Sequence, residues 1–245
     1  MKILYAIGGG EISELETFKI DEAIVASAEK RHPKALFIPT ASGEPEGYVD
    51  SFVKLYGDRL GCEIDVLRLL DGNTSSLEAE EKIMSSDIVY VGGGNTRMMM
   101  AVWKEYGLDK SLKKAHEKGI VLSGLSAGSI CWFSKGQSDI EEFKRGSLDN
   151  YTCVDGIGIL DAMHCPHYNE DTRDIDFAEK IKSFDGIGIA IDNNCAIEIK
   201  NNTYKIHKSD SKANAYKIYY KNKELFKEVL DNEDEYLSLE ELMKL

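Results

Sequence analysis

The stretch Gly124-Leu125-Ser126-Ala127-Gly128-Ser129 decides the fold prediction. It follows a short apolar run at 120–122 and precedes another at 130–133. A strand, a tight turn of small residues and a helix form the setting of a nucleophile elbow, which the pattern G-x-S-x-G describes. Small neighbours permit the strained backbone that exposes a serine hydroxyl at the end of a strand. We therefore expect Ser126 at the carboxyl end of a strand; an ordinary Gly/Ser-rich turn is the structural alternative.

Upstream of this turn, short apolar runs alternate with segments of helical periodicity. The expected strands are 3–7, 35–38, 63–67 and 87–91, and the expected helices are 12–30, 48–56, 76–84, 98–103 and 108–118. This alternation is typical of a parallel sheet covered by helices on both faces. Ligands bind such sheets at the carboxyl ends of the strands. The glycine turn at 92–94 and Ser126 are both expected at that edge.

The pattern changes beyond residue 156. Short runs separated by Asn- and Asp-rich turns predict hairpins appended to the sheet, at 187–191, 196–199 and 203–206. A terminal helix is expected over 236–244. Neither an internal repeat nor a low-complexity linker marks a boundary, so the expectation is one α/β domain covering residues 1–245.

Composition limits the partners. The chain of 245 residues has a net charge of −13 and no basic patch, which argues against nucleic acid. No apolar run reaches membrane-spanning length, and the first is too short for a signal peptide, so no membrane partner is expected. The five cysteines include no C-x-x-C pair, which favours reduced thiols and a cytoplasmic location. The oligomeric state is left open.

A serine nucleophile needs a base within hydrogen-bond reach. The five histidines are His32, His116, His164, His167 and His207. His164 and His167 share the segment Met163-His164-Cys165-Pro166-His167-Tyr168, in which a Pro-His-aromatic turn is suited to hold an imidazole over a strand end. His167 is the preferred base, and a hydrogen-bonded structural role is the alternative for either residue.

Three motifs together resemble one family. They are Gly124-Leu125-Ser126-Ala127-Gly128-Ser129, Val91-Gly92-Gly93-Gly94-Asn95-Thr96 and Cys165-Pro166-His167-Tyr168. The combination is similar to the dipeptidase E / cyanophycinase family of serine peptidases, and more to its dipeptidase E branch, from the first strand to about residue 199. The resemblance implies a flavodoxin-like, three-layer fold similar to class I glutamine amidotransferases, with serine as nucleophile and with neither a metal nor another cofactor.

The resemblance also implies roles for individual residues. Ser126 matches the nucleophile and His167 the base. Gly93, Gly94 and Ala127 match oxyanion-hole positions, where close approach of backbone amides favours residues without a Cβ atom.

The group that orients His167 stays open among three residues. The family's acid falls on Asn193, with Asp192 one residue before, and Asp139 matches a second acidic position. Asp192 is the first choice, although an amide orients the histidine in papain-like enzymes.

The resemblance implies hydrolysis of short peptides, including dipeptides with an N-terminal aspartate. Arg173 matches a position suited to pair with the substrate carboxylate. Two alternatives stand beside this function. One is a cyanophycinase-like β-aspartyl hydrolase, and the other is a non-catalytic flavodoxin-like module that binds a small molecule at the glycine turn.

Overall fold

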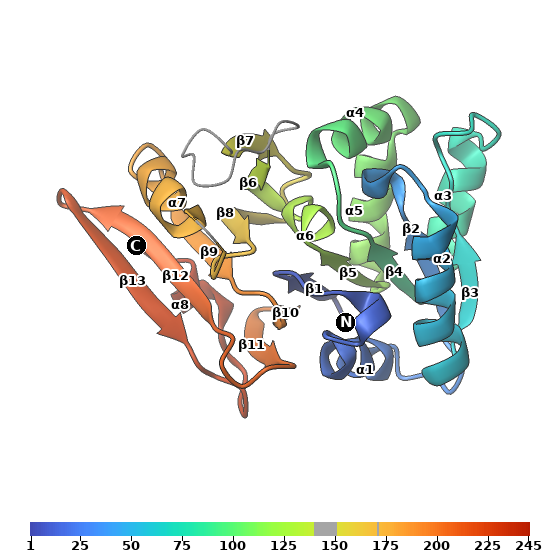
Figure 1. Cartoon of the computed structure of the whole chain (residues 1–245), viewed down its shortest axis with the longest axis horizontal. Helices are drawn as coiled ribbons and strands as arrows, with labels where there is room; N and C mark the ends of the chain where they lie inside the picture. Colours follow the sequence, from blue (N-terminus) through green and yellow to red (C-terminus); the bar gives the residue numbers. More distant parts are fainter. Residues whose placement is uncertain (140–150, 171) are drawn as a thin grey trace.

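A computed structural model describes residues 1–139, 151–170 and 172–245, and within these residues the strands form two sheets (Figure 1). The chain is a mixed α/β protein with parallel strands at its centre, as the apolar runs predict. The single sheet expected from the sequence is wrong, because the later strands pair with one another in a second sheet.

The first sheet has a parallel centre in the order β1-β5-β4-β2-β3. These strands are β1 (Ile3–Ile7), β2 (Lys34–Ile38), β3 (Glu63–Val66), β4 (Ile88–Val91) and β5 (Val121–Leu125). An antiparallel hairpin of β10 (Cys195–Lys200) and β11 (Thr203–Lys208) pairs with the free edge of β1, and β14 (Leu237–Ser238) pairs with β11. This part matches the expectation of an appended hairpin.

The second sheet has the order β13-β12-β9-β8-β6-β7. Its strands are β6 (Phe133–Asp139), β7 (Tyr151–Asp155), β8 (Leu160–Pro166), β9 (Ile187–Ile191), β12 (Ala215–Lys221) and β13 (Glu224–Leu230). The run 187–191, expected in an appended hairpin, is instead a central strand that lies parallel to β8 and antiparallel to β12. Figure 1 shows β12 and β13 at the opposite end of the molecule from α2 and α3.

Helices cover both faces of the first sheet. On one face lie α1 (Phe18–Ser27) and α2 (Glu46–Phe52), and on the other lie α3 (Ser76–Met84), α4 (Thr96–Tyr106) and α5 (Leu108–Lys118). The described residues also form α6 (Ala127–Ile130), α7 (Arg173–Ile181), which packs on the second sheet, and α8 (Leu239–Leu242). Alternate strand residues face opposite helices, because side chains alternate along a strand. Leu36 and Val89 join the core of α3, α4 and α5, whereas Phe37 and Tyr90 join the core of α1 and α2.

Two segments near the site depart from the predicted helices. The segment 12–30 divides into a short 3₁₀ turn, η1 (Ile12–Glu14), and α1, because Leu15 adopts a left-handed backbone with φ of 61°. The predicted helix 48–56 is α2 followed by a π-helix, η3 (Val53–Arg59). The expected terminal helix is reduced to β14 and the short α8.

Candidate active site

Ser126 stands between β5 and α6 with φ of 56° and ψ of −114°. Non-glycine residues rarely take a positive φ, and where they do the surrounding structure holds them there. The Ser126 amide donates to the Ile7 carbonyl at the end of β1, and the Ser126 carbonyl accepts from the Ile130 amide in α6. The backbone is therefore fixed on both sides of the exposed hydroxyl.

The small residues beside Ser126 are required by close backbone contacts. A Cβ atom at Gly124 would lie 2.0 Å from the Gly128 carbonyl oxygen, and one at Gly128 would lie 2.2 Å from the Val91 carbonyl oxygen. A side chain at either position would force β5, β4 and α6 apart. The pattern G-x-S-x-G is thus explained by packing around the turn.

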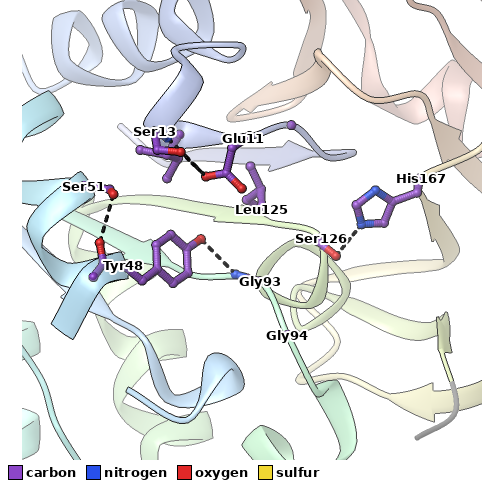
Figure 2. A pocket seen from close by; sticks show the side chains of 12 residues that line it. Glu11, Ser13, Tyr48, Ser51, Gly93, Gly94, Leu125, Ser126 and His167 are labelled. Atoms are coloured by element: carbon purple, nitrogen blue, oxygen red, sulfur yellow. Dashed lines mark hydrogen bonds between the residues drawn. The ribbon is translucent and has the colours of Figure 1, made fainter. Parts of the chain in front are cut away.

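His167 follows β8 and lies across from Ser126 (Figure 2). Its Nε2 atom lies 2.5 Å from the Ser126 Oγ atom. Its backbone φ is 148°, again outside the usual range for a residue with a side chain. The side chain is only partly buried, with 18% of its surface exposed, so a bound molecule has access to the imidazole.

Asn193, in the turn between β9 and β10, contacts the other nitrogen of His167. Its Oδ1 atom lies 2.7 Å from His167 Nδ1, and its Nδ2 atom donates to the Glu170 carboxylate at 2.8 Å. A carboxylate only accepts, so the amide NH₂ faces Glu170 and the amide oxygen faces His167. Nδ1 then carries the proton, and Nε2 is free to accept the hydroxyl proton of Ser126.

Glu170 completes this chain of contacts. Its Oε1 atom lies 3.5 Å from His167 Nδ1. Hydrogen bonding to His167, supported by the bond from Asn193, lowers the pKa of Glu170 to about 2. A carboxylate that stays ionised at this position stabilises positive charge on the imidazole.

Asp192, the first choice for the orienting group, does not lie against His167 in the structure. Its Oδ2 atom accepts from the Asn214 amide at 2.9 Å, and no hydrogen bond or ion pair joins it to His167 in the described part of the chain. Asp139 does not reach His167 either, because its carboxylate pairs with Arg173 at 2.7 Å. Of the three predicted candidates, only Asn193 contacts the imidazole.

The prediction that Arg173 binds substrate also disagrees with its position. The side chain is 3% exposed and its guanidinium lies over the Tyr151 ring at 4.9 Å. It pairs with Asp139, and its Nε atom lies 3.7 Å from Glu170. The Arg173 guanidinium therefore places positive charge next to the Glu170 carboxylate, and Arg173 does not line the cavity at Ser126.

The predicted oxyanion-hole residues lie near Ser126 in the structure. A Cβ atom on Gly93 would lie 3.3 Å from the Ser126 Cβ atom, and Gly94 lines the same cavity. Ala127 is the first residue of α6, where helix amides have no intrahelical acceptor. The Gly93 amide donates to the Tyr48 hydroxyl at 3.2 Å. A substrate oxygen would either replace this hydroxyl as the acceptor or share the amide N–H with it.

A cavity of about 520 Å³ opens beside Ser126 and His167. Figure 2 shows Tyr48, Ser51, Glu11 and Ser13 on the side away from Ser126 and His167. The Glu11 carboxylate accepts from the Ser13 amide and hydroxyl, and it brings negative charge to the cavity wall.

His164, the alternative base, lies inside the protein. Its Nε2 atom is 2.8 Å from the Ser129 hydroxyl, its Nδ1 atom is 2.9 Å from the Ile189 carbonyl oxygen, and its ring stacks on Phe133. Burial lowers the pKa of His164 to about 3. The structure therefore gives His164 the structural role that was the alternative for both histidines.

Two contributors are missing from the sequence analysis. Glu170 is one, and its only signal is its spacing three residues after His167. Gly9 is the other: a Cβ atom there would lie 2.0 Å from Asn193 Oδ1 and 2.4 Å from His167 Nδ1. The absence of a side chain at Gly9 allows the segment after β1 to approach the His167–Asn193 pair.

Two further features are absent from the described residues. Across 1–139, 151–170 and 172–245, no helix combines the length and apolar character needed to cross a bilayer. The same residues contain no group of three or more His, Cys, Asp or Glu side chains arranged to hold a metal ion.

Comparison with known proteins agrees with the elbow and its fold. The model of peptidase family S51 matches residues 4–207, and the chain belongs to this family, as its motifs predict. It is similar to the uncharacterized peptidase YgaJ of Bacillus subtilis (strain 168), with 35% identity over 222 residues that cover 89% of this chain and 92% of YgaJ.

Two crystal structures share the fold. One is a peptidase from an acI-B1 Actinobacterium, with a TM-score of 0.71 and 20% identity over 97% of both chains. The other is a putative peptidase E protein from Listeria monocytogenes EGD-e, with a TM-score of 0.62 and 21% identity over 85% of this chain and 98% of that one. At these identities the likeness concerns the fold alone.

Proposed function

We propose that the protein is a serine-type exopeptidase that hydrolyses short peptides. The hydrogen bond between Ser126 Oγ and His167 Nε2, at a strained strand-to-helix turn, carries this proposal. His167 takes the hydroxyl proton as Oγ attacks the scissile carbonyl carbon, and then gives the proton to the departing amine. A water molecule activated by His167 releases the acyl group from Ser126.

Asn193 and Glu170 support the base in this proposal. Asn193 holds the tautomer that leaves Nε2 free, and the Glu170 carboxylate stabilises the imidazolium as it forms. The amides of Gly93, Gly94 and Ala127 receive the negative charge that develops on the carbonyl oxygen. Backbone donors suit this role because they are already oriented before the reaction.

The cavity favours short peptides with a free amino end. A volume of about 520 Å³ accommodates a few residues, and the Glu11 carboxylate suits a protonated α-amino group. Dipeptides with an N-terminal aspartate belong to the proposed substrate class through family membership. In the described part of the chain, no lysine or arginine lines this cavity, so a substrate carboxylate needs a cation outside it.

The fold and domain assignments extend the same proposal. The parallel strands lie in the order β3-β2-β4-β5-β1. Counted from β2, the first four of them follow the flavodoxin-like order 2-1-3-4, and β1 occupies the fifth position. This order supports a flavodoxin-like class similar to class I glutamine amidotransferases. One core cluster includes residues of both sheets, which supports a single α/β domain over residues 1–245.

Covalent labelling tests the nucleophile. A fluorophosphonate probe should modify wild-type protein at Ser126, and Ser126→Ala should lose the label and about 10³-fold or more in kcat. The melting temperature should change little, because the exposed hydroxyl contributes little to packing. Ser129→Ala is the matched control within the elbow and should still be labelled. Peptide turnover by purified Ser126→Ala would overturn the proposal.

A substrate panel separates the remaining alternatives. It contains Asp-Leu, Asn-Leu, Ala-Leu and β-aspartyl-Leu. Cleavage of the α-linked dipeptides supports the exopeptidase, whereas cleavage of β-aspartyl-Leu alone would assign a cyanophycinase-like hydrolase. Unlabelled protein that cleaves none of them would favour a binding module.

A further inference from the structure

A second cavity lies beside the one at Ser126. It has a volume of about 240 Å³, and Ile12, Ser13 and Ser51 line both cavities. Because three residues line both, the two cavities are neighbours on the protein surface. A peptide that places its carbonyl at Ser126 therefore binds beside the second cavity.

The second cavity is distinguished by its positive charge. Lys54 and Arg59 line it, and both are exposed. Neither makes an ion pair with a residue of the described ranges, although Asp58 lies next to Arg59 in the chain. The Arg59 guanidinium lies 6.0 Å from the centre of the Phe18 ring, which restricts its position. Two cations without carboxylate partners are thus available to a ligand, in a protein whose net charge is −13.

The π-helix η3 explains why both cationic side chains line the same cavity. Lys54 and Arg59 are five residues apart, and in an α-helix they would point about 140° away from each other. In a π-helix, hydrogen bonds join residues five apart, so such residues lie on the same side of the helix. The Leu60 amide donates to the Leu55 carbonyl at 3.0 Å, which is a bond of this kind. The local winding therefore directs both side chains to one cavity, and π-helical turns are frequent at functional sites.

We propose that Lys54 and Arg59 bind a carboxylate of the peptide substrate, in a subsite separate from the residues that contact the scissile bond. This inference rests on the proposed function of the Ser126 site. Leu15 and Leu55 line the same cavity and suit the methylene groups that precede a carboxylate. The carboxylate is either the carboxyl terminus of a short peptide or an acidic side chain.

Pairs of peptides that differ only by a carboxylate or a carboxamide test the subsite. Ala-Leu against Ala-Leu-amide tests the carboxyl terminus, and Asp-Leu-amide against Asn-Leu-amide and Ala-Asp-amide against Ala-Asn-amide test side chains at the two positions. For at least one pair, wild-type protein should favour the acid in kcat/KM by roughly five- to tenfold, as expected for two partly solvated charge contacts.

The double variant Lys54→Met/Arg59→Met should reduce that ratio to about one. The control Lys104→Met/Lys110→Met removes the same charge from exposed positions that line neither cavity, and it should keep the wild-type ratio. Raising the salt concentration should reduce the wild-type ratio but leave that of the double variant unchanged. An acid preference that survives in Lys54→Met/Arg59→Met, or the absence of any preference in wild type, would overturn the inference.

A binding measurement separates this inference from the catalytic one. If wild-type protein cleaves no peptide, the proposed function fails, and the subsite is then tested by titrating Ser126→Ala protein with the same pairs in a calorimeter. Tighter binding of the acid, lost when Lys54→Met/Arg59→Met is added, supports the subsite. Equal dissociation constants for acid and amide in Ser126→Ala protein would exclude it.

Discussion

His164 and His167 make nearly the same contacts in two different surroundings. In each, Nδ1 faces an oxygen acceptor, the Ile189 carbonyl for His164 and the Asn193 amide oxygen for His167. In each, Nε2 faces a serine of the elbow, Ser129 or Ser126. The two imidazoles thus share a tautomer and a type of partner, although one is fully buried and the other opens to a cavity.

The difference between them lies in charge and access. Burial disfavours the charged, doubly protonated form of His164 and lowers its pKa, whereas the Glu170 carboxylate lies 3.5 Å from His167 Nδ1. Ser129 is buried within α6, and its hydroxyl also contacts the Ser126 carbonyl. A hydrogen bond to serine therefore does not distinguish the two histidines; only His167 also has a carboxylate nearby and an adjoining cavity in the described structure.

The largest expected effect is on catalysis at His167. His167→Gln should reduce kcat by about 10³-fold or more, because glutamine cannot take the Ser126 proton at neutral pH. Peptide hydrolysis and the rate of fluorophosphonate labelling measure this loss. The free energy of unfolding should change little, because the side chain is partly exposed. Near-normal turnover by His167→Gln would reverse the contrast between the two histidines.

The next effect concerns two adjacent residues, Asn193 and Asp192. Asn193→Ala removes the acceptor for His167 Nδ1–H and should reduce kcat by about 10²-fold, less than the roughly 10⁴-fold cost of altering a triad carboxylate. Asp192→Ala is the matched control and should keep activity, because Asp192 contacts Asn214 instead. Activity measured at saturating peptide compares the two. A larger loss in Asp192→Ala would show that Asp192 reaches the histidine during the reaction.

The sequence predicted the centre of the fold better than its second half. Apolar runs such as 88–91 have a continuous pattern that only a doubly covered strand explains, so the parallel centre was accessible. β12, Ala215–Lys221, mixes lysine and tyrosine with only two aliphatic residues, so it lacks the continuous apolar run of a buried strand. Its inward side chains pack only because β9 and β13 lie on either side, which local sequence does not indicate.

The candidate site divides in the same way. Ser126 depends on a local turn whose glycines are visible in the sequence, and the motif around His167 is equally compact. The orientation of His167 depends on Asn193, which lies in another turn. It also depends on a backbone φ of 148°, which cannot be predicted from the residue type. Arg173 looked free for a ligand because its partner Asp139 is 34 residues away in the chain. Long-range pairing of charges is what the sequence did not reveal.

A smaller effect concerns the stability that His164 controls. Burial lowers the pKa of His164 to about 3, below the value of about 6.5 in the unfolded chain. Between these values the unfolded state binds more protons, so this contribution to stability is complete above pH 6.5 and is lost as the pH falls toward 3. From pH 7 to pH 4.5 the loss should be about 2–3 kcal/mol.

Urea unfolding of wild type and His164→Gln at the two pH values measures this effect as the difference between their pH dependences. An NMR titration of wild type provides a second readout that does not depend on the variant folding. The His164 ring signals should stay in the neutral form to pH 4.5. Protonation of this ring near pH 6.5 would contradict the buried role.

The smallest effect is a loss of stability as the pH rises, and it arises at Asp21 on the face of the first sheet that α1 and α2 cover. Asp21 is fully buried in α1 and accepts from the Tyr56 hydroxyl at 2.7 Å and the Thr17 hydroxyl at 2.8 Å. Burial raises the pKa of Asp21 to about 7, above its ordinary value of 3.8. The folded state therefore holds the extra proton, and this contribution to stability is complete below pH 3.8 and declines until the pH passes 7.

From pH 6 to pH 8, wild type should lose about 1 kcal/mol that Asp21→Asn, which is neutral throughout, retains. Tyr56→Phe is the companion variant, because it removes one bond to the ionised form and should steepen the decline. Parallel pH profiles of wild type and Asp21→Asn would mean that Asp21 stays ionised, and that the two hydroxyl donors outweigh the cost of its burial.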